Sequence, residues 1–406
     1  MVSVLSFLNP LLVFVISIIV FLVLLYRKVG LGISLTVSAF LMGLLSLGIW
    51  DTGTVLLQTC TDSTTLTLVF ASFFIILMSV LYKDTGLVND LTKSLGSFVK
   101  NSKIIVSVLP AAIGLMPVAG GALMSAPMVD TEADKLGLSD AKKSFINIWF
   151  RHVIIPVYPV TQFIILTAAL TQTSIDSLIV RQIFVVIVMI AVGYFIGLRN
   201  IKPQKTDNKT EVNKKANIKL LILSFFPIIA TVVLNAALGI DIAIATFIGV
   251  IAILVITRTN FEVFKKTLKN KAVWEVTLAA FGAMLLKNVT VASGASEILG
   301  NALASTNMDQ MLLVSIVPAV VAFLIGSTSG AIALSVPILA ETVAFVPKTA
   351  SLLYIQSYLG YMIAPTHLCL VFTAQYFKSS INSSFKYLLP ATAVSMAAAI
   401  LTYIFM

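Results

Sequence analysis

Charged residues are scarce in this sequence. Asp, Glu, Lys and Arg make up 11% of the 406 residues, whereas soluble domains carry about 25%. Hydrophobic residues make up 59%, so most of the chain must be solvated by lipid or by itself. The composition therefore excludes an ordinary water-soluble enzyme. At roughly 20 residues per crossing helix, plus loops, the chain has room for about ten transmembrane segments.

Histidine and cysteine are also rare, with two of each. Because Cys60 and Cys369 are too few for a disulfide framework, we interpret them as structurally incidental. The chain has no HExxH motif and no Gly-x-Gly-Asp motif. A serine acting with His367 has no visible orienting acid. An intramembrane hydrolase is thus the least favoured function, and we expect a protein that is not an enzyme and uses no cofactor.

The long apolar stretches predict an all-α polytopic membrane protein. Two regions, 104–129 and 312–345, are interrupted by Pro117–Gly121 and Gly326–Gly330. Each half is too short to cross about 30 Å of hydrocarbon at ~1.5 Å per residue, so both regions are predicted to be re-entrant hairpins. The ten stretches long enough to span are 10–25, 31–49, 66–82, 145–170, 183–198, 220–238, 242–256, 272–289, 352–377 and 387–405.

The distribution of basic residues predicts the orientation. With both termini outside, all Lys and Arg residues except four fall on the cytoplasmic side, as expected for a multi-pass protein of the cell membrane. The formal charge of +10 then needs no nucleic-acid partner. The four exceptions are Arg151, Arg181, Lys287 and Lys348.

The two halves of the chain repeat each other. Residues 1–198 and 220–406, joined by a cytoplasmic linker at 199–219, superimpose at an offset close to 209 residues, which places Pro110 on Pro318 and Pro156 on Pro365. Each half contains five spans, an odd number, so the second half enters the membrane upside down. Inverted repeats with broken helices are typical of secondary transporters, whose sites lie at the repeat interface.

The hairpin tips are candidate binding sites. Backbone groups freed inside a membrane must be satisfied by protein, water or a ligand. Ser327, Thr328 and Ser329 can donate to a carboxylate, and a sodium ion near Ser327 and Thr328 is a further candidate. The first tip, with Gly120 and Gly121, offers mainly backbone until Ser125. The alternative is that the tip glycines only let helices pack closely.

The first broken span carries an intramembrane arginine. Asn147, Arg151 and His152 precede Pro156 and Pro159, which must open the helical hydrogen-bond ladder. If Arg151 faces inward, its guanidinium matches a carboxylate in bidentate geometry. Alternatively, Arg151 reaches the cytoplasmic surface.

The second broken span contains Pro365, Thr366 and His367. His367, like His152, is a candidate proton carrier, and the alternative is a neutral histidine bonded to a freed carbonyl. Lys287 either binds substrate, neutralises a buried carboxylate or reaches outward to water. Acidic residues are absent from the deep membrane positions, which favours an anionic substrate.

These features resemble a known superfamily. The order of spans, hairpins and broken helices is similar to the ion-transporter superfamily, which includes gluconate, citrate and divalent-anion/sodium symporters. The segments Leu115-Met-Pro-Val-Ala-Gly-Gly-Ala-Leu-Met-Ser-Ala-Pro127 and Ala364-Pro-Thr-His-Leu-Cys-Leu370 most resemble an uncharacterised prokaryotic membrane family allied to the gluconate permeases. The resemblance implies an elevator-type fold, carboxylate binding, a homodimer, and site roles for Gly120, Gly121, Pro156, Ser327, Thr328, Ser329, Pro365 and Thr366.

We therefore expect a secondary active transporter of a small organic anion, such as a sugar acid or a di- or tricarboxylate. The Ser-Asn-Thr signature of the sodium/dicarboxylate branch is not present, so coupling to protons is an alternative to coupling to sodium. A channel, and a membrane component that needs a partner protein, are the alternative functions.

Overall fold

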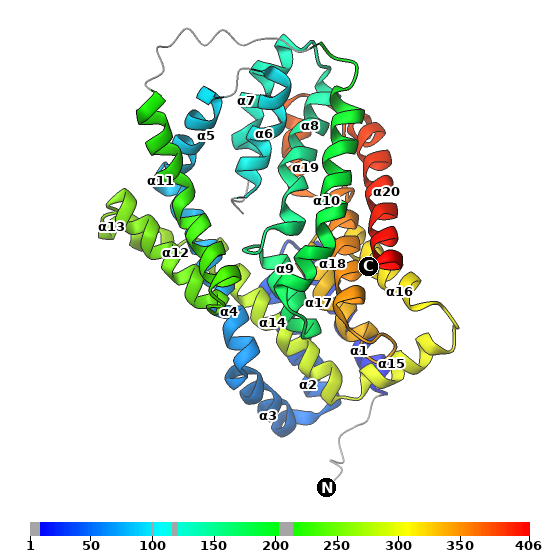
Figure 1. The fold of residues 1–406 in the computed structure, drawn as a ribbon. Helices are drawn as coiled ribbons and strands as arrows, with labels where there is room; N and C mark the ends of the chain where they lie inside the picture. Colours follow the sequence, from blue (N-terminus) through cyan, green and yellow to red (C-terminus); the bar gives the residue numbers. More distant parts are fainter. Residues whose placement is uncertain (1–8, 99–100, 116–120, 203–213) are drawn as a thin grey trace.

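The computed structural model describes residues 9–98, 101–115, 121–202 and 214–406, and within these ranges it contains helices and no strand (Figure 1). The helices of the first half are α1 (Pro10–Tyr26), α2 (Leu31–Ser46), α3 (Gly48–Thr61), α4 (Ser63–Asp84), α5 (Leu87–Phe98), α6 (Ser102–Gly114), α7 (Gly121–Lys135), α8 (Asp140–Val153), η1 (Ile155–Val157), α9 (Gln162–Thr171) and α10 (Ile175–Leu198). The linker predicted at 199–219 lies partly outside the described residues.

The helices of the second half follow the same order. They are α11 (Lys214–Val232), η2 (Val233–Ala237), α12 (Ile242–Thr257), α13 (Phe261–Leu268), α14 (Lys271–Ala292), α15 (Ala295–Ala304), α16 (Gln310–Ile325), α17 (Thr328–Leu339), α18 (Pro347–Met362), α19 (Leu368–Tyr376) and α20 (Ile381–Phe405). Matching helices also begin alike, since Ser174 and Ser380 cap α10 and α20 by accepting from the backbone three residues on.

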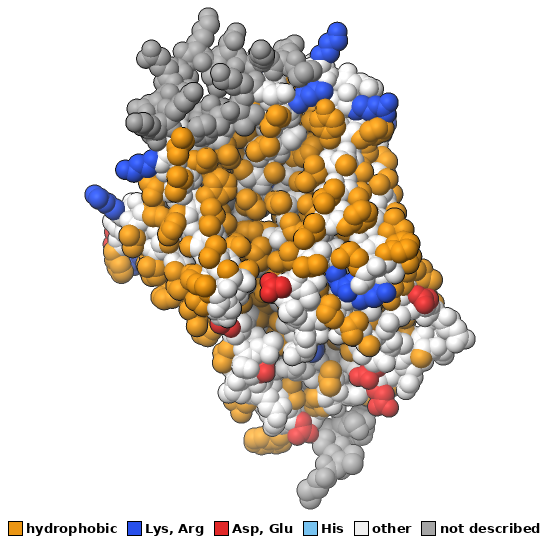
Figure 2. All heavy atoms as spheres, in the orientation of Figure 1, with side chains coloured by type: hydrophobic (Ala, Val, Ile, Leu, Met, Phe, Trp, Pro, Cys, Tyr) orange, Lys and Arg blue, Asp and Glu red, His pale blue; other side chains and the backbone are white. Residues whose placement is uncertain are grey.

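The protein is an all-α membrane protein. Six segments are long and apolar enough to cross a membrane. Three of them, Ile175–Leu198, Asn217–Ala237 and Ile381–Phe405, are mostly exposed; on α10, Ile187 and Phe195 are 58% and 59% exposed, which only a lipid surround makes favourable. The face in Figure 2 is largely hydrophobic between two more polar ends. The six segments are Ser63–Asp84, Asp140–Thr171, Ile175–Leu198, Asn217–Ala237, Lys271–Ala292 and Ile381–Phe405.

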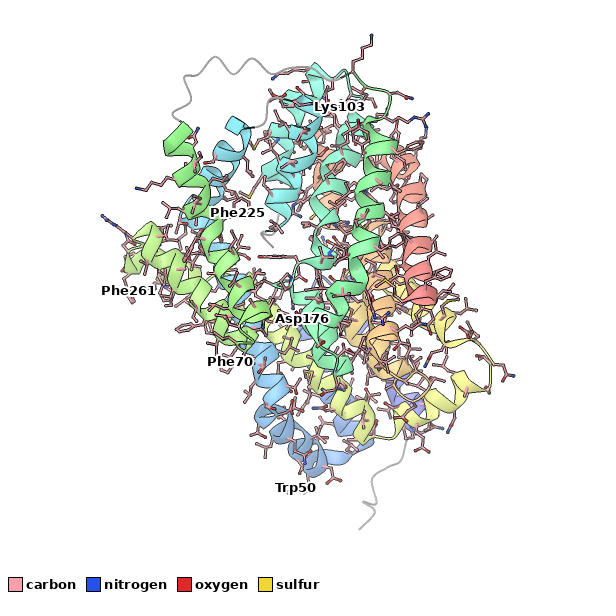
Figure 3. The ribbon with its side chains drawn as sticks, viewed as in Figure 1. Trp50, Phe70, Lys103, Asp176, Phe225 and Phe261 are labelled. Atoms are coloured by element: carbon pink, nitrogen blue, oxygen red, sulfur yellow. The ribbon has the colours of Figure 1, made fainter. Side chains whose placement is uncertain are left out.

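The two ends of the molecule differ in charge. Basic side chains gather at the end that carries Lys103, and most acidic side chains in view lie toward the end that carries Trp50 (Figures 2 and 3). Six segments are fewer than the ten spans that hydropathy predicts, because α1, α2 and α12 have only 17, 16 and 16 residues and α18 and α19 form an interrupted pair.

Helix contacts come in exchanged pairs. α2 packs on α14 and α12 packs on α4; α9 packs on α17 and α19 packs on α7; α10 packs on α18 and α20 packs on α8. Each contact joins one helix of the first half to one helix of the second half. In each pair of contacts, the second contact is made by the helices of the other half that are equivalent to those of the first. Such contacts are those of a pseudo-twofold arrangement.

The helices form two bundles. The first bundle contains α1, α2, α4, α11, α12 and α14, and the second contains α6 to α10 and α16 to α20. The two bundles meet where α17 packs on α14 and α9 packs on α4. Among the described residues, the exchanged counterparts, α7 on α4 and α19 on α14, make at most slight contact.

Candidate functional site

Two helix interruptions lie at the centre of the second bundle. α8 ends at Val153, passes through η1 with the buried Pro156, and resumes as α9 at Gln162. α18 ends at Met362 and resumes as α19 at Leu368. The prolines explain both interruptions, because they cannot donate to the helical ladder.

The two interruptions are in contact through a group of side chains that we call the break cluster: Arg151, His152, Tyr358, Tyr361, His367 and Cys369. Arg151 Nη1 donates to Cys369 Sγ at 3.5 Å, and the rings of His152 and His367 stand edge to face with centroids 5.1 Å apart. Arg151, His152 and His367 are 5%, 2% and 0% exposed. The sequence predicted Arg151, His152 and His367 as separate candidates, and the structure brings them together.

Both histidines are oriented by backbone carbonyls. His152 Nδ1 lies 2.7 Å from the Ile148 oxygen, and His367 Nδ1 lies 3.4 Å from the Met362 oxygen. A carbonyl can only accept, so each Nδ1 carries the hydrogen, and a neutral ring keeps a lone pair on Nε2. His367 Nε2 is buried without a hydrogen-bond partner.

Tyrosines from α18 satisfy the carbonyls that the first interruption frees. Tyr358 Oη donates to the His152 oxygen at 2.8 Å, and Tyr354 Oη donates to the Ile155 oxygen at 3.5 Å. Tyr354, Tyr358 and Tyr361 share one face of α18 at spacings of four and three residues. The sequence analysis did not name these tyrosines. Their spacing within an apolar stretch is the signal that could have identified them.

Both hairpins reach the interruptions. A Cβ placed on Gly114, at the end of α6, would overlap the carbonyl oxygen of Arg151. A Cβ placed on Gly326, at the end of α16, would overlap Thr366 Oγ1. Gly326 also has a φ of +70°, which L side chains rarely adopt. The glycines therefore let each hairpin approach a broken helix closely.

The second hairpin tip presents hydroxyl groups at the start of α17. Ser327 Oγ accepts from the Gly330 nitrogen at 3.1 Å and caps the helix. Thr328 is 1% exposed and its Oγ1 has no partner, and Ser329 is also buried. Pro365 and Thr366 are exposed beside this tip. The positive end of the α17 dipole and an unpaired buried hydroxyl both suit an anion.

The first hairpin is tied to the interruptions by an asparagine. Ser125 Oγ donates to Asn147 Oδ1 at 2.6 Å, and Asn147 Nδ2 donates to the Ala122 oxygen at 3.0 Å and to Thr373 Oγ1 at 3.2 Å. Asn147 thus links α7, α8 and α19. Gly121 begins α7, and Gly120 lies outside the described residues.

Comparison with protein families assigns the chain. The family described as Protein of unknown function (DUF401) matches residues 8–406. The chain belongs to this family. No curated protein matches it. The break cluster, both interruptions and the described parts of both hairpins of this DUF401 protein all lie within the matched range.

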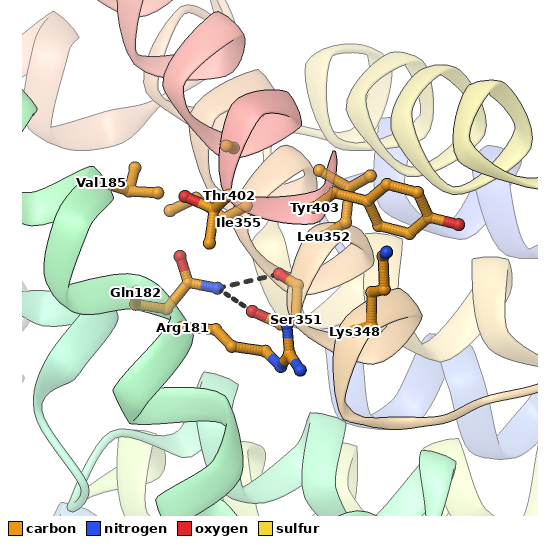
Figure 4. Close-up of a pocket in the computed structure, with 10 residues that line it drawn as sticks. Arg181, Gln182, Val185, Lys348, Ser351, Leu352, Ile355, Thr402 and Tyr403 are labelled. Atoms are coloured by element: carbon orange, nitrogen blue, oxygen red, sulfur yellow. Dashed lines mark hydrogen bonds between the residues drawn. The ribbon is translucent and has the colours of Figure 1, made fainter. Parts of the chain in front are cut away.

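The other three cations that the predicted topology places away from the cytoplasmic side of the DUF401 protein lie apart from the break cluster. Lys287 lines an open cavity of about 620 Å³ together with Asp62 and Asn288. Arg181 and Lys348 line a narrow groove in which Gln182 Nε2 donates to the Ser351 oxygen at 2.9 Å and to its Oγ at 2.6 Å (Figure 4). Of the four cations that the topology singled out, Arg151 is the one in the break cluster.

The break cluster also contains metal-ligating atoms. One ring nitrogen each of His152 and His367 and the sulfur of Cys369 all lie within 4.8 Å of one another. The sequence gave no reason to single out Cys369, whose contact with Arg151 spans 218 residues of chain. The interpretation of this cysteine as incidental did not anticipate its contact with Arg151.

Proposed function

We propose that this DUF401 protein is a secondary active transporter of a small organic anion, a carboxylate of the sugar-acid or di- or tricarboxylate class. One observation carries the proposal: two hairpins and two interrupted helices, one of each from either half of the chain, meet in one region, where the end of α6 and Cys369 lie against the buried Arg151 and the end of α16 lies against Thr366. Convergence of discontinuous helices from two repeats is the construction that transporters use for substrate sites.

The chemistry of the convergence suits a carboxylate. A guanidinium can hold both carboxylate oxygens at once, and an intramembrane charge is a functional residue by default. The N-terminus of α17 adds backbone N–H groups, and Thr328 adds a hydroxyl donor that has no partner in the protein. The histidines that face Arg151 add no negative charge that would oppose an anion.

The proposed membrane topology has ten spans. The six long segments are joined by α1, α2 and α12, and the interrupted pair α18 and α19 supplies the tenth. A helix of 17 residues covers about 25 Å, which flanking residues extend to the thickness of the hydrocarbon. The two hairpins enter from opposite sides, both termini lie outside, and the protein resides in the cell membrane. The architecture is that of the ion-transporter superfamily, for which a homodimer is expected.

The two bundles support an elevator mechanism. The break cluster and both hairpins belong to the second bundle, whereas the first bundle contributes α4 and α14 at the contact between them. Because the contact involves α9 and α17 but little of their counterparts α19 and α7, the second bundle sits toward one end of the first. Displacement toward the other end would expose the site on the opposite side of the membrane.

The coupling ion is a proton or sodium. His152 and His367 are the proton-carrying candidates, and the hydroxyl groups of Ser327 and Thr328 are the sodium candidates. If a pH gradient drives accumulation of the anion without sodium, the coupling ion is the proton and the histidines are its candidate carriers. If a sodium gradient drives accumulation at equal pH, the coupling ion is sodium and the two hydroxyl groups are its candidate ligands.

Transport into liposomes tests the proposal. The full chain, reconstituted and shown to be folded, is expected to accumulate a radiolabelled gluconate, citrate or succinate probe under one of these gradients. Arg151→Gln removes a charged hydrogen-bond donor worth about 1.5–3 kcal/mol, so the affinity should fall roughly 10- to 150-fold. Arg151→Lys, which keeps the positive charge, should retain part of the affinity for the anion.

Arg181→Gln is the matched control, because Arg181 lies in a different groove and its replacement should leave the affinity unchanged. Absence of accumulation across a broad anion panel contradicts the proposal. So does an Arg151→Gln variant that transports as well as the native protein.

A further inference from the structure

Three side chains of the break cluster have the arrangement of a metal site. His152 comes from α8, and His367 and Cys369 come from the start of α19, so the two halves of the chain both contribute. Their ligand atoms lie within 4.8 Å of one another. Metal–ligand bonds of about 2.0–2.3 Å place the atoms of a three-coordinate site about 3.5–4.0 Å apart. The side chains therefore need to close by about an ångström.

The surroundings of the histidines match those of metal ligands. Ligating histidines almost always donate their second ring N–H to a carbonyl or carboxylate, which fixes the tautomer. His152 and His367 both do so through Nδ1, to the oxygens of Ile148 and Met362. His367 is 0% exposed, and its Nε2 has a lone pair with no partner. An unpaired buried nitrogen is costly unless something binds it.

We propose that His152, His367 and Cys369 bind one soft monovalent metal ion of the Cu⁺ class. Thiolate and imidazole are ligands that Cu⁺ favours. The ion replaces the thiol hydrogen: the S–H bond of Cys369 breaks, an S–Cu bond forms, and one proton is released. No oxidation occurs, and the net charge of the site is the same before and after.

Charge conservation selects a monovalent ion over a divalent one. Arg151 already places a positive charge 3.5 Å from Cys369 Sγ. Zn²⁺ would add one further positive charge after loss of the thiol proton, and burying an uncompensated charge is expensive. Cu⁺ adds none. Pro365, Thr366 and Leu368, which neighbour the two second-half ligands in the chain, are exposed, and Leu368 is 64% exposed.

The bound ion would join α8 of the first half to α19 of the second. This inference is independent of the proposed transport function, because binding is measured on the purified protein without a membrane gradient. Transport without Cu⁺ binding would refute only the metal site. Cu⁺ binding without transport would refute only the proposed transport function.

Competition with a chromophoric Cu⁺ chelator under anaerobic, reducing conditions tests the site in the detergent-purified full chain. The native protein is expected to withdraw one equivalent of Cu⁺, and Cys369→Ser to lose at least tenfold in affinity. Cys60→Ser is the matched control, since Cys60 is exposed on α3, and it should bind as the native protein does. Zn²⁺ at the same free concentration should not bind.

A second measurement does not depend on altering the site. In the Cys60→Ser background Cys369 is the single cysteine, and one equivalent of Cu⁺, or of Ag⁺ as a redox-stable substitute, should slow its alkylation by a maleimide at least tenfold. Unchanged alkylation overturns the proposal. So does an equivalent of Cu⁺ that Cys369→Ser still holds with native affinity, or stronger binding of Zn²⁺ than of Cu⁺.

Discussion

Replacing Gly114 by alanine tests how closely the first hairpin approaches the broken helix. The added methyl group would overlap the carbonyl oxygen of Arg151. Since backbone cannot turn aside as a side chain can, α6 and α8 must separate, and overpacking of this kind costs about 1–3 kcal/mol. Gly360 provides the same test in the second half, where its methyl group would overlap the carbonyl oxygen of Ala319 on α16.

Gly53 is the matched control. It lies inside α3 with nothing within 4 Å of the position of its Cβ. Gly53→Ala should therefore stabilise the protein by up to about 1 kcal/mol, because alanine is the better helix former. All three variants replace glycine by alanine, so helix propensity acts in the same direction in each. A loss of stability therefore reports the close backbone contact, and a gain reports helix propensity.

The assay is thermal unfolding in one detergent at a fixed heating rate, followed by tryptophan fluorescence. Of the three tryptophans, Trp149 is fully buried in α8, whereas Trp50 and Trp274 are exposed, so exposure of Trp149 on unfolding should account for most of the change in the signal. Gly114→Ala and Gly360→Ala should unfold several degrees below the native protein, and Gly53→Ala at or above it. If Gly114→Ala unfolds at the same temperature as Gly53→Ala, the first hairpin does not contact Arg151 closely, and the convergence described above is wrong.

Two further predictions concern single side chains at the site. Asn147→Leu removes the hydrogen bond that the buried Thr373 hydroxyl accepts and one hydrogen bond of Ser125, whose hydroxyl keeps its bond to the Ala122 oxygen, so the unfolding temperature should fall by the equivalent of about 1–3 kcal/mol; an unchanged unfolding temperature would contradict this network. Thr328→Val removes a buried hydroxyl that has no protein partner, so stability in the absence of ligand should stay equal or rise, while anion affinity in an equilibrium binding assay falls severalfold. Lower stability with unchanged affinity would show that the hydroxyl is structural.

Hydropathy and proline positions anticipate much of the helical arrangement. The predicted span 352–377 corresponds to α18 and α19, with the interruption near Pro365. The sequence did not predict α3, α5, α13 and α15, which have 14, 12, 8 and 10 residues. Short helices of mixed polarity leave no long apolar stretch, so their formation depends on the larger helices they cover.

The candidate site could be predicted only in part. Arg151, His152 and His367 are visible as polar residues in apolar surroundings, because burial of such residues needs a reason. Their meeting depends on a contact between segments 218 residues apart, which spacing along the chain cannot reveal. Cys369 becomes significant through that contact alone. Lys287 carries the same local signal as Arg151 but lines a separate cavity, so a buried charge indicates a site without saying which one.

On the proposed function, the exchanged helix contacts define a second conformation of the same chain. Within each bundle, contacts occur in pairs related by the pseudo-twofold, but between the bundles, among the residues that the structure describes, α17 and α9 make the contact and α7 and α19 make little. Applying the pseudo-twofold to the whole molecule generates a second arrangement in which α7 packs on α4 and α19 packs on α14. Both arrangements keep the contacts inside each bundle, so they differ mainly at one interface between similar helices. Because Arg151 and both interruptions belong to the second bundle, on the proposed function a bound anion travels with that bundle.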